Sequence, residues 1–221
     1  MTAPRAVAPP DPAGLLSLVQ WLSPAFPLGA FAYSHGMETA IATGDLANAA
    51  TVEAWIGEIL ARGGAWGDAV LLAHSLRPGA DHAALAALAR ALAPTAERLR
   101  ETEELGSALA RATGALTGGE EAPLPYPVAL GRAAAPLGLP APLVIALWLQ
   151  SFSASLASVA VRFVPLGQTE GQAILAHLHP LILRLADAAA TAPLSAIASA
   201  TIRADMASAL HETLAVRMFR T

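Results

Sequence analysis

Histidines, with a few neighbouring hydroxyl and carboxyl groups, are the residues of this 221-residue chain best suited to catalysis. Ser34 precedes His35, but Ala32 stands where the nucleophile elbow G-x-S-x-G requires its first glycine. Adjacent residues also rarely provide the geometry that a nucleophile and its base require. We therefore expect Ser34 to cap the N-terminus of a helix, supported by Glu38 in the early turns.

Metal binding is the other chemistry that histidines could provide. His177 and His179 are two residues apart, and such positions point to different sides of a helix. His211-Glu212 begins like the zinc-protease motif H-E-x-x-H, but Ala215 replaces the second histidine. The metal candidates are therefore weak: His35, His177, His179 and His211. We expect each to be a surface residue or a hydrogen-bonded core residue.

Two residue types are missing from the chain, which contains no cysteine and no lysine. Without cysteine there is no disulfide, thiolate nucleophile or iron–sulfur cluster. Without lysine there is no Walker A P-loop and no Schiff-base catalysis. The net charge of −4 and the scattered arginines argue against a nucleic-acid partner. We expect no intrinsic cofactor.

Alanine and leucine dominate the chain, and apolar residues recur at helical spacing. This pattern predicts an all-α fold, a single-domain bundle of about ten helices. The composition of residues 1–12 predicts a flexible Pro/Ala-rich tail, and residues 13–221 make up the predicted helical domain. The predicted helices cover 13–22, 34–42, 48–62, 68–76, 81–92, 94–116, 128–137, 140–163, 168–190 (bent at Pro180) and a last region from 193. The stretch 117–127 is the predicted exposed loop.

A charge-free stretch between residues 133 and 161 raises the question of a membrane span. The window 143–161 is apolar enough to qualify by hydropathy. Ser151, Ser155 and Ser158 share one helix face, which allows close packing in water or in lipid. A lone span would split the core of a soluble bundle, so we favour a buried central helix over a single-span membrane protein.

Three polar segments have two possible roles each. The run from Arg98 to Glu104 is either a solvated helix face with ion pairs or an interface patch. Gln150, Gln168 and Gln172 are either hydrogen-bonded core amides or the lining of a polar passage. The terminal segment 217–221 has an exposed-looking phenylalanine between two arginines and either frays or binds a partner.

Four motifs follow one another along the chain. The first is a rigid loop with two prolines and two glycines: Ser23, Pro24, Pro27, Gly29, Phe31, Tyr33, Ser34, Gly36, Met37 and Glu38. The second is Arg100, Glu101, Thr102 and Gly106. The third lies in 162–172 and includes Arg162, Pro165, Gly167, Gln168 and Gln172. The last is His211, Glu212, Arg217, Met218, Phe219, Arg220 and Thr221. In order and in register, these four motifs resemble the UreF family of urease accessory proteins.

The resemblance implies a cytoplasmic, all-helical, non-enzymatic accessory protein for nickel delivery to urease. Family members dimerise and bind the accessory protein UreD (UreH) and the GTPase UreG, and the complex docks on apo-urease. Nickel would pass through the complex transiently. By this resemblance, a partner-binding C-terminal tail covers about 210–221, and its end, Arg217 to Thr221, orders on binding UreD. The first motif, with Arg162 and Gln168, then shapes dimer or partner surfaces.

An alternative function remains open beside this adaptor role. The chain could activate the GTPase directly with an arginine finger, for which Arg220 or Arg100 would be the candidates. Neither function involves a membrane.

Overall fold

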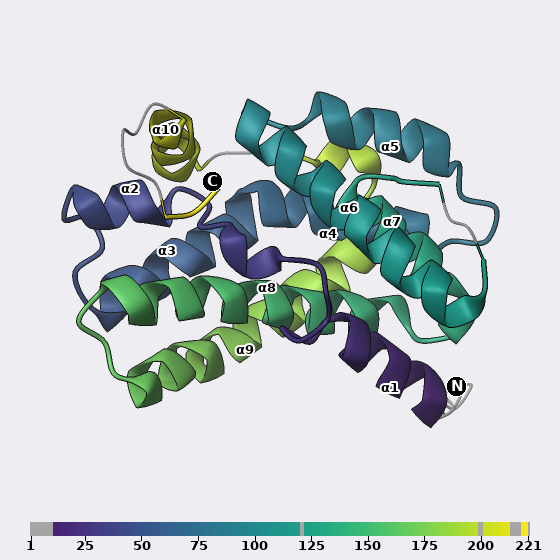
Figure 1. The fold of residues 1–221 in the computed structure, drawn as a ribbon, viewed down its shortest axis with the longest axis horizontal. Coiled ribbons are helices and arrows are strands. Elements are labelled where there is room, and N and C mark those ends of the chain that lie inside the picture. Colours follow the sequence, from purple (N-terminus) through teal and green to yellow (C-terminus); the bar gives the residue numbers. More distant parts are fainter. Residues whose placement is uncertain (1–10, 120–121, 199–200, 213–217, 221) are drawn as a thin grey trace, which may run out of the picture.

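The computed structural model describes residues 11–119, 122–198, 201–212 and 218–220, without the side chains of Phe31, Ile202 and Asp205. Across these residues the chain forms ten α-helices and three short 3-10 turns, with no strand (Figure 1). The all-α prediction is confirmed. Residues 1–10 of the predicted tail lie outside the described part, and the first helix begins at Pro12.

The helices follow the predicted order closely. They are α1 (Pro12–Trp21), α2 (Met37–Ala42), α3 (Ala49–Arg62), α4 (Gly64–Ser75), α5 (His82–Ala91), α6 (Ala96–Thr117), α7 (Tyr126–Ala134), α8 (Ala141–Phe163), α9 (Gln168–Thr191) and α10 (Ile202–His211). The 3-10 turns are η1 (Ala30–Ala32), η2 (Ala135–Leu137) and η3 (Leu194–Ala196). Pro180 is accommodated inside α9.

Side-chain caps explain several of the helix starts. The Asp11 carboxylate accepts from the N–H groups of Ala13 and Gly14 at the start of α1. Asn48 and Thr51 form a reciprocal capping box at α3, and Asp81 caps α5 as predicted.

The prediction that Ser34 is the cap of its helix is wrong. The helix α2 begins at Met37, and its cap is Gly36 in the left-handed region (φ 77°). His35 also has a positive φ of 51°, so the helix cannot extend back to Ser34. The Ser34 hydroxyl still accepts a long hydrogen bond from the Glu38 N–H (3.4 Å).

The helix pair α8 and α9 forms the centre of the bundle, and α8 carries Ile145, Trp148, Leu149 and Leu156 into the core (Figure 1). Both helices are long and apolar enough to cross a membrane by length and composition alone. Half of the apolar window of α8 and a third of that of α9 are buried inside the bundle. This placement agrees with the prediction of a buried central helix.

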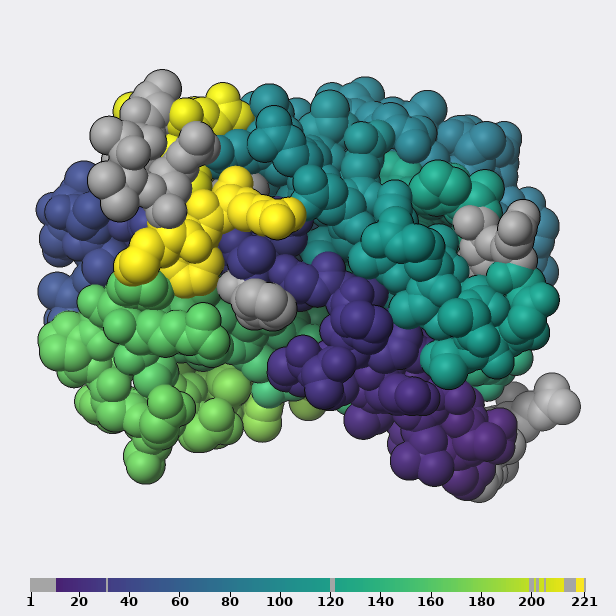
Figure 2. All heavy atoms as spheres, in the orientation of Figure 1, coloured from purple at the N-terminus to yellow at the C-terminus, as the bar shows by residue number. Residues whose placement is uncertain are grey.

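The C-terminal part of the described chain meets the N-terminal loop on one face. Helix α10 packs against α2, and residues 218–220 then cross the surface toward η1 and α6. Figure 2 shows these C-terminal residues in yellow, between α8 in green and the N-terminal loop in purple. Segments more than 100 residues apart in sequence are thereby brought together.

Candidate partner-binding site

The C-terminal segment 218–220 docks against four elements of the fold: α8, η1, α6 and α2. The Phe219 side chain is buried and its ring meets that of Phe163 edge to face, with centroids 5.3 Å apart. The Arg220 N–H donates to the Ala32 carbonyl (2.7 Å), and the Arg220 guanidinium pairs with Glu104 of α6 (2.7 Å). The expectation that Phe219 is exposed is wrong, because the end of α8 covers it.

Tyr33 connects this docked segment to the N-terminal loop. Its hydroxyl donates to Glu104 Oε2 at 2.8 Å, the same oxygen that receives Arg220. Burial and the neighbouring Glu104 carboxylate raise the pKa of Tyr33, so the hydroxyl stays a donor. The loop, α6 and the terminus therefore share one carboxylate.

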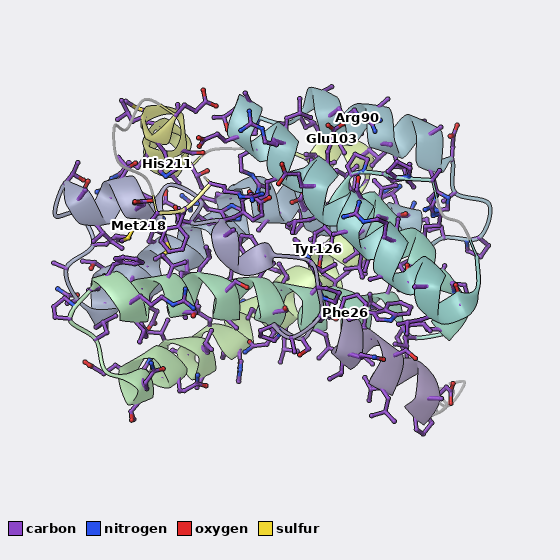
Figure 3. The ribbon with its side chains drawn as sticks, in the orientation of Figure 1. Phe26, Arg90, Glu103, Tyr126, His211 and Met218 are labelled. Carbon is purple, nitrogen blue, oxygen red and sulfur yellow. The ribbon has the colours of Figure 1, made fainter. Side chains whose placement is uncertain are left out.

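His211 and Glu38 form a second connection to the terminus. His211 is fully buried at the end of α10, with Nδ1 2.9 Å from Glu97 and Nε2 3.0 Å from Glu38. Glu38 also accepts the backbone N–H groups of Met218 (2.9 Å) and Phe219 (3.0 Å). Figure 3 labels His211 and Met218 at the α2 and α10 end of the molecule. Glu212 accepts from the Glu97 N–H at 3.2 Å.

A buried charge cluster lies beside this connection and contradicts the prediction of a solvated face for Arg98 and Glu101. Glu101 pairs with both Arg98 and His35, the latter at 3.1 Å, and Arg98 also reaches Asp68 of α4 (3.4 Å). The side chains of Arg98 and Glu101 are only 12% and 5% exposed. Glu103 and Glu104 of the same run are exposed as predicted. Arg100, the remaining charge of the run, is exposed as well.

The cluster shifts the pKa values of its acids in opposite directions. Burial raises the pKa of Asp68 to about 6, since Arg98 compensates only in part. Burial also opposes ionisation of Glu101, but Arg98 and His35 overcome it and lower its pKa to about 2. Burial lowers the pKa of His35, and the nearby Arg98 guanidinium adds to that effect.

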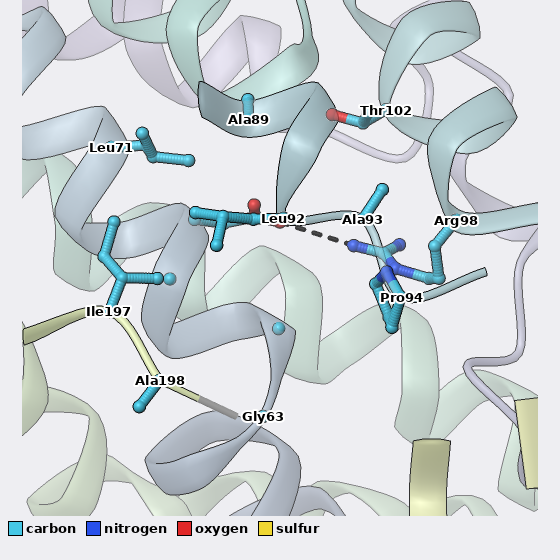
Figure 4. Close-up of a pocket in the computed structure, with 13 residues that line it drawn as sticks. Gly63, Leu71, Ala89, Leu92, Ala93, Pro94, Arg98, Thr102, Ile197 and Ala198 are labelled. Carbon is cyan, nitrogen blue, oxygen red and sulfur yellow. Dashed lines mark hydrogen bonds and ion pairs between the residues drawn. The ribbon is translucent and has the colours of Figure 1, made fainter. Parts of the chain in front are cut away.

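A cavity of about 100 Å³ adjoins Arg98, between α4, the end of α5 and residues 197–198 (Figure 4). Its wall is largely apolar, with Leu71, Leu92 and Ile197, and the dashed line in Figure 4 marks the pair between Arg98 and Asp68. Because both charged groups of the wall already pair with each other, the cavity offers little to orient a polar ligand.

Two glycines of these motifs, Gly36 and Gly106, lie where the backbone of another segment approaches closely. A Cβ on Gly36 would lie 2.8 Å from the Ser208 nitrogen of α10, and one on Gly106 would overlap the Leu124 carbonyl. Gly29 has a φ of 77° with open space around it.

The remaining residues of the first motif form the loop itself. Ser23, Pro24 and Pro27 lie in turns, in which the Ser23 hydroxyl accepts from the Ala25 N–H. The side chain of Phe31 lies outside the described part of the structure.

Apart from Phe163, which contacts Phe219, the residues of the third motif lie away from this site, at the α8–α9 corner. Of its residues, Pro165, Gln168 and Gln172 are exposed, and Arg162 and Gly167 lie beside them at the ends of the two helices. The prediction that Gln168 and Gln172 are buried core amides is therefore wrong. Gln150 is partly buried, and its Oε1 has no hydrogen-bond partner within the described structure.

None of the four metal candidates lies in a cluster that could hold a metal ion, within the part of the chain that the structure describes. His35 contacts Glu101, and His211 contacts both Glu38 and Glu97. His177 pairs with Glu53 on the surface (2.9 Å), and His179 is exposed. Ser34 is fully buried and the His35 side chain is 11% exposed, so neither faces an open cleft.

Sequence reasoning misses three residues of the site: Asp68, Glu97 and Phe163. Asp68 and Glu97 are single acids within helices, and only the fold reveals that they face Arg98 and His211. Phe163 lies in the third motif, and nothing in its neighbours indicates contact with Phe219. Arg217 of the last motif lies outside the described residues.

Comparison with known proteins identifies the family. The UreF family model matches residues 46–179, more than half of the chain. A urease accessory protein UreF of Cereibacter sphaeroides is 63% identical over 209 residues, which cover 95% of this chain and 99% of the relative. The UreF of Paracoccus denitrificans is 50% identical over 209 residues, which cover 95% of this chain and 97% of the length of that relative. The chain belongs to the UreF family of urease accessory proteins, which assist urease maturation and are not themselves enzymes.

Proposed function

We propose that this chain is an adaptor that bridges UreD (UreH) and the GTPase UreG during urease maturation. The assembled complex docks on apo-urease, and GTP hydrolysis by UreG is coupled to nickel delivery. Nickel is the cargo and passes through the complex transiently. The chain acts as a homodimer in the cytoplasm, without a nucleic-acid or membrane partner.

The joined surface of the N-terminal loop, α6 and the C-terminus supports this proposal. Arg220 and Met218 remain exposed although the backbone around them is fixed by Ala32 and Glu38. A surface hollow beside Arg220 is lined by Pro27, Gly29, Glu104 and Arg111 among others. A fixed backbone that presents an exposed arginine and methionine is typical of a protein-binding surface, because little ordering entropy remains to be lost on binding.

The test is co-purification of UreD and UreG with tagged variants. Arg220→Ala removes an exposed arginine of the surface, and Arg203→Ala on α10 is its matched control, since the two side chains are 65% and 67% exposed and each pairs with one acid. We expect R220A to weaken capture of at least one partner at least about tenfold, which corresponds to the loss of one interface arginine, and R203A to leave both unchanged. Intact binding of both partners after deletion of 210–221 would refute the assignment of the tail to a partner surface.

Direct activation of the GTPase is the second candidate, because the guanidinium groups of Arg220 and Arg100 are solvent accessible. An arginine finger contributes about 10³–10⁵ to turnover. UreG turnover is therefore measured at saturating concentrations of R220A, R100A and R203A. A loss of orders of magnitude in one of the first two supports an activator, and unchanged turnover in both supports the adaptor.

A further inference from the structure

The cavity beside Arg98 is a feature of the fold that the proposed partner surface does not use. Its volume is about 100 Å³, and its wall includes Leu92, which is 43% exposed, so the cavity reaches the surface (Figure 4). Leu71, Leu92 and Ile197 make the wall apolar, and Asp68 and Arg98 are its charged residues. An apolar cavity of roughly 150 Å³ takes a benzene ring, so a group that fits here has about the size of a four-carbon chain.

The acid of this wall is only partly paired. Arg98 donates to Asp68 Oδ2 at 3.4 Å, which is long for a charged pair, and Asp68 Oδ1 receives no hydrogen bond from the residues that the structure describes. Arg98 lies closer to Glu101 than to Asp68. The Asp68 side chain is 21% exposed. Burial and the nearby Glu101 carboxylate raise its pKa to about 6, although Arg98 opposes them. A second cation beside Asp68 would therefore stabilise its charge.

A cation on an aliphatic stem matches this wall better than a neutral polar group does. An ammonium needs only an acceptor with a free lone pair, which Asp68 Oδ1 provides, and the stem covers the apolar wall. Lysine combines a compact ammonium with a flexible four-carbon stem, whereas the guanidinium of arginine is planar and broader. This chain contains no lysine, so a lysine side chain in the cavity comes from a different protein and not from a second copy.

We propose that the cavity is a binding site for the lysine side chain of a partner protein, with the stem against Leu71, Leu92 and Ile197 and the ammonium at Asp68. The described walls of this cavity and of the hollow beside Arg220 have no residue in common. The inference therefore adds a second contact surface to the proposed function, on which it rests for the identity of the partner as UreD or UreG.

Small amines test the cavity in the full chain without a partner. n-Butylammonium represents the lysine side chain, and n-butanol has the same stem without the charge. NMR of ¹³C-methyl isoleucine follows both titrations, because Ile197 lies in the wall. At a pH well above 6, where Asp68 is ionised, we expect n-butylammonium to shift the Ile197 signal and to bind at least about tenfold more tightly than n-butanol. Equal affinities, or an Ile197 signal that neither compound shifts, would overturn the inference.

Two variants separate the charge of the cavity from its shape. Asp68→Asn removes the charge and should lower the affinity for n-butylammonium to that for n-butanol. Ala93→Leu fills part of the cavity from its half-exposed wall, leaves the charged residues in place and should weaken binding of both compounds. Asp45→Asn is the matched control, since Asp45 also pairs with a single arginine but lies on the surface. If D68N binds n-butylammonium as tightly as D45N does, Asp68 does not hold the ammonium and the inference fails.

Carbodiimide cross-linking identifies the occupant in the complex with UreD and UreG. The reagent joins a carboxyl group to an amine in contact with it: an amide bond forms, and the carbodiimide takes up the released water as a urea. Because this chain has no lysine, a lysine amide at Asp68 comes from a partner. We expect mass spectrometry to find this bond with a lysine of UreD or UreG, and A93L to capture that partner at least about tenfold more weakly than D45N does.

The combined outcomes separate this inference from the proposed function. Tighter binding of the charged compound, together with a bond between Asp68 and a partner lysine, supports both. Capture of both partners without that bond, and with equal strength in A93L, overturns the inference and leaves the adaptor role standing. If neither partner is captured, the adaptor role is contradicted, and the titrations of the unaltered chain, D68N and A93L decide the inference.

Discussion

Two histidines, His35 and His211, lie against carboxylates of α6 in settings that differ in one respect. His35 meets Glu101, which is also paired with Arg98. His211 lies between Glu97 and Glu38, with one acid at each ring nitrogen. The first cluster contains a guanidinium, which stays charged at all relevant pH values, and the second joins one imidazole to acids of two helices.

The two clusters therefore differ in what they connect. In the first, which we call the fixed cluster, His35 can stay neutral and still donate one hydrogen bond to Glu101, and burial lowers its pKa. The fixed cluster joins the N-terminal loop to α6 and α4. The second, which we call the bridging cluster, joins α10 to α2 and α6, and its Glu38 also accepts the backbone N–H groups of Met218 and Phe219.

The largest effect is expected from breaking the fixed cluster with Arg98→Met. This change removes the cation shared by the partly buried Asp68 and the buried Glu101, and loss of one partner of a buried pair costs about 3–5 kcal/mol. The free energy of unfolding from urea denaturation measures the loss. Arg90→Met is the control, because Arg90 and its partner Glu103 are 44% and 46% exposed and their pair is worth at most about 1 kcal/mol. Equal losses of unfolding free energy in the two variants would mean that the buried cluster contributes no more to stability than an exposed ion pair.

Sequence reasoning can predict the helices because each carries its own signals. The apolar spacing of α3, the Asp81 cap and Pro140 before α8 all depend on neighbours within a few residues. The start of α2 escapes such reasoning because α10, about 170 residues later, packs against Gly36, where the chain makes a left-handed turn. Local propensity contains no information on that contact.

The candidate site shows the same limit. The motif residues Tyr33, Glu38, Glu101, His211 and Arg220 can be named from the sequence, and they do come together. Their acidic partners Asp68 on α4 and Glu97 on α6 cannot be named from the sequence, since a single acid in a helix is usually a surface residue. The corner glutamines belong to a helix that is apolar overall, which favours an interior position, but they lie at its exposed start.

Gly36→Ala should damage the bridging cluster and spare the fixed one. Its Cβ would lie 2.8 Å from the Ser208 nitrogen, so α10, which carries His211, must move away from α2. Overpacking adds about 1–3 kcal/mol to a left-handed strain of about 1–2 kcal/mol. The control is Gly29→Ala, because Gly29 has the same φ of 77° in open space and the variant should show the strain alone. Urea denaturation measures the free energy of unfolding of both variants. A loss in G36A no larger than the loss in G29A would contradict the close contact between Gly36 and α10.

Asp68→Asn should change how stability depends on pH within the fixed cluster. Burial raises the pKa of Asp68 from 3.8 to about 6, so the folded state binds a proton that the unfolded state has released between these values. Stability from this group therefore falls as the pH rises from about 4 to about 6, and is constant above. Glu101 acts in the opposite direction: because its pKa is lowered from 4.5 to about 2, its contribution to stability is lost as the pH falls below 4.5. We expect the difference in unfolding free energy between D68N and the unaltered chain to change across pH 4–6 and level off above. A pH-independent difference would show that Asp68 titrates normally.

The smallest effect is expected at a third histidine–acid pair, His177 with Glu53, which joins α9 to α3 at the surface. The two side chains are 65% and 38% exposed, so water screens their attraction and holding them together costs side-chain entropy. His177→Ala should therefore change the free energy of unfolding by at most about 1 kcal/mol. Urea denaturation measures this change, as for Arg98→Met. A loss of about 3–5 kcal/mol in H177A, as large as the loss expected for R98M, would contradict the argument that burial, rather than the presence of two opposite charges, decides how much an ion pair contributes to stability.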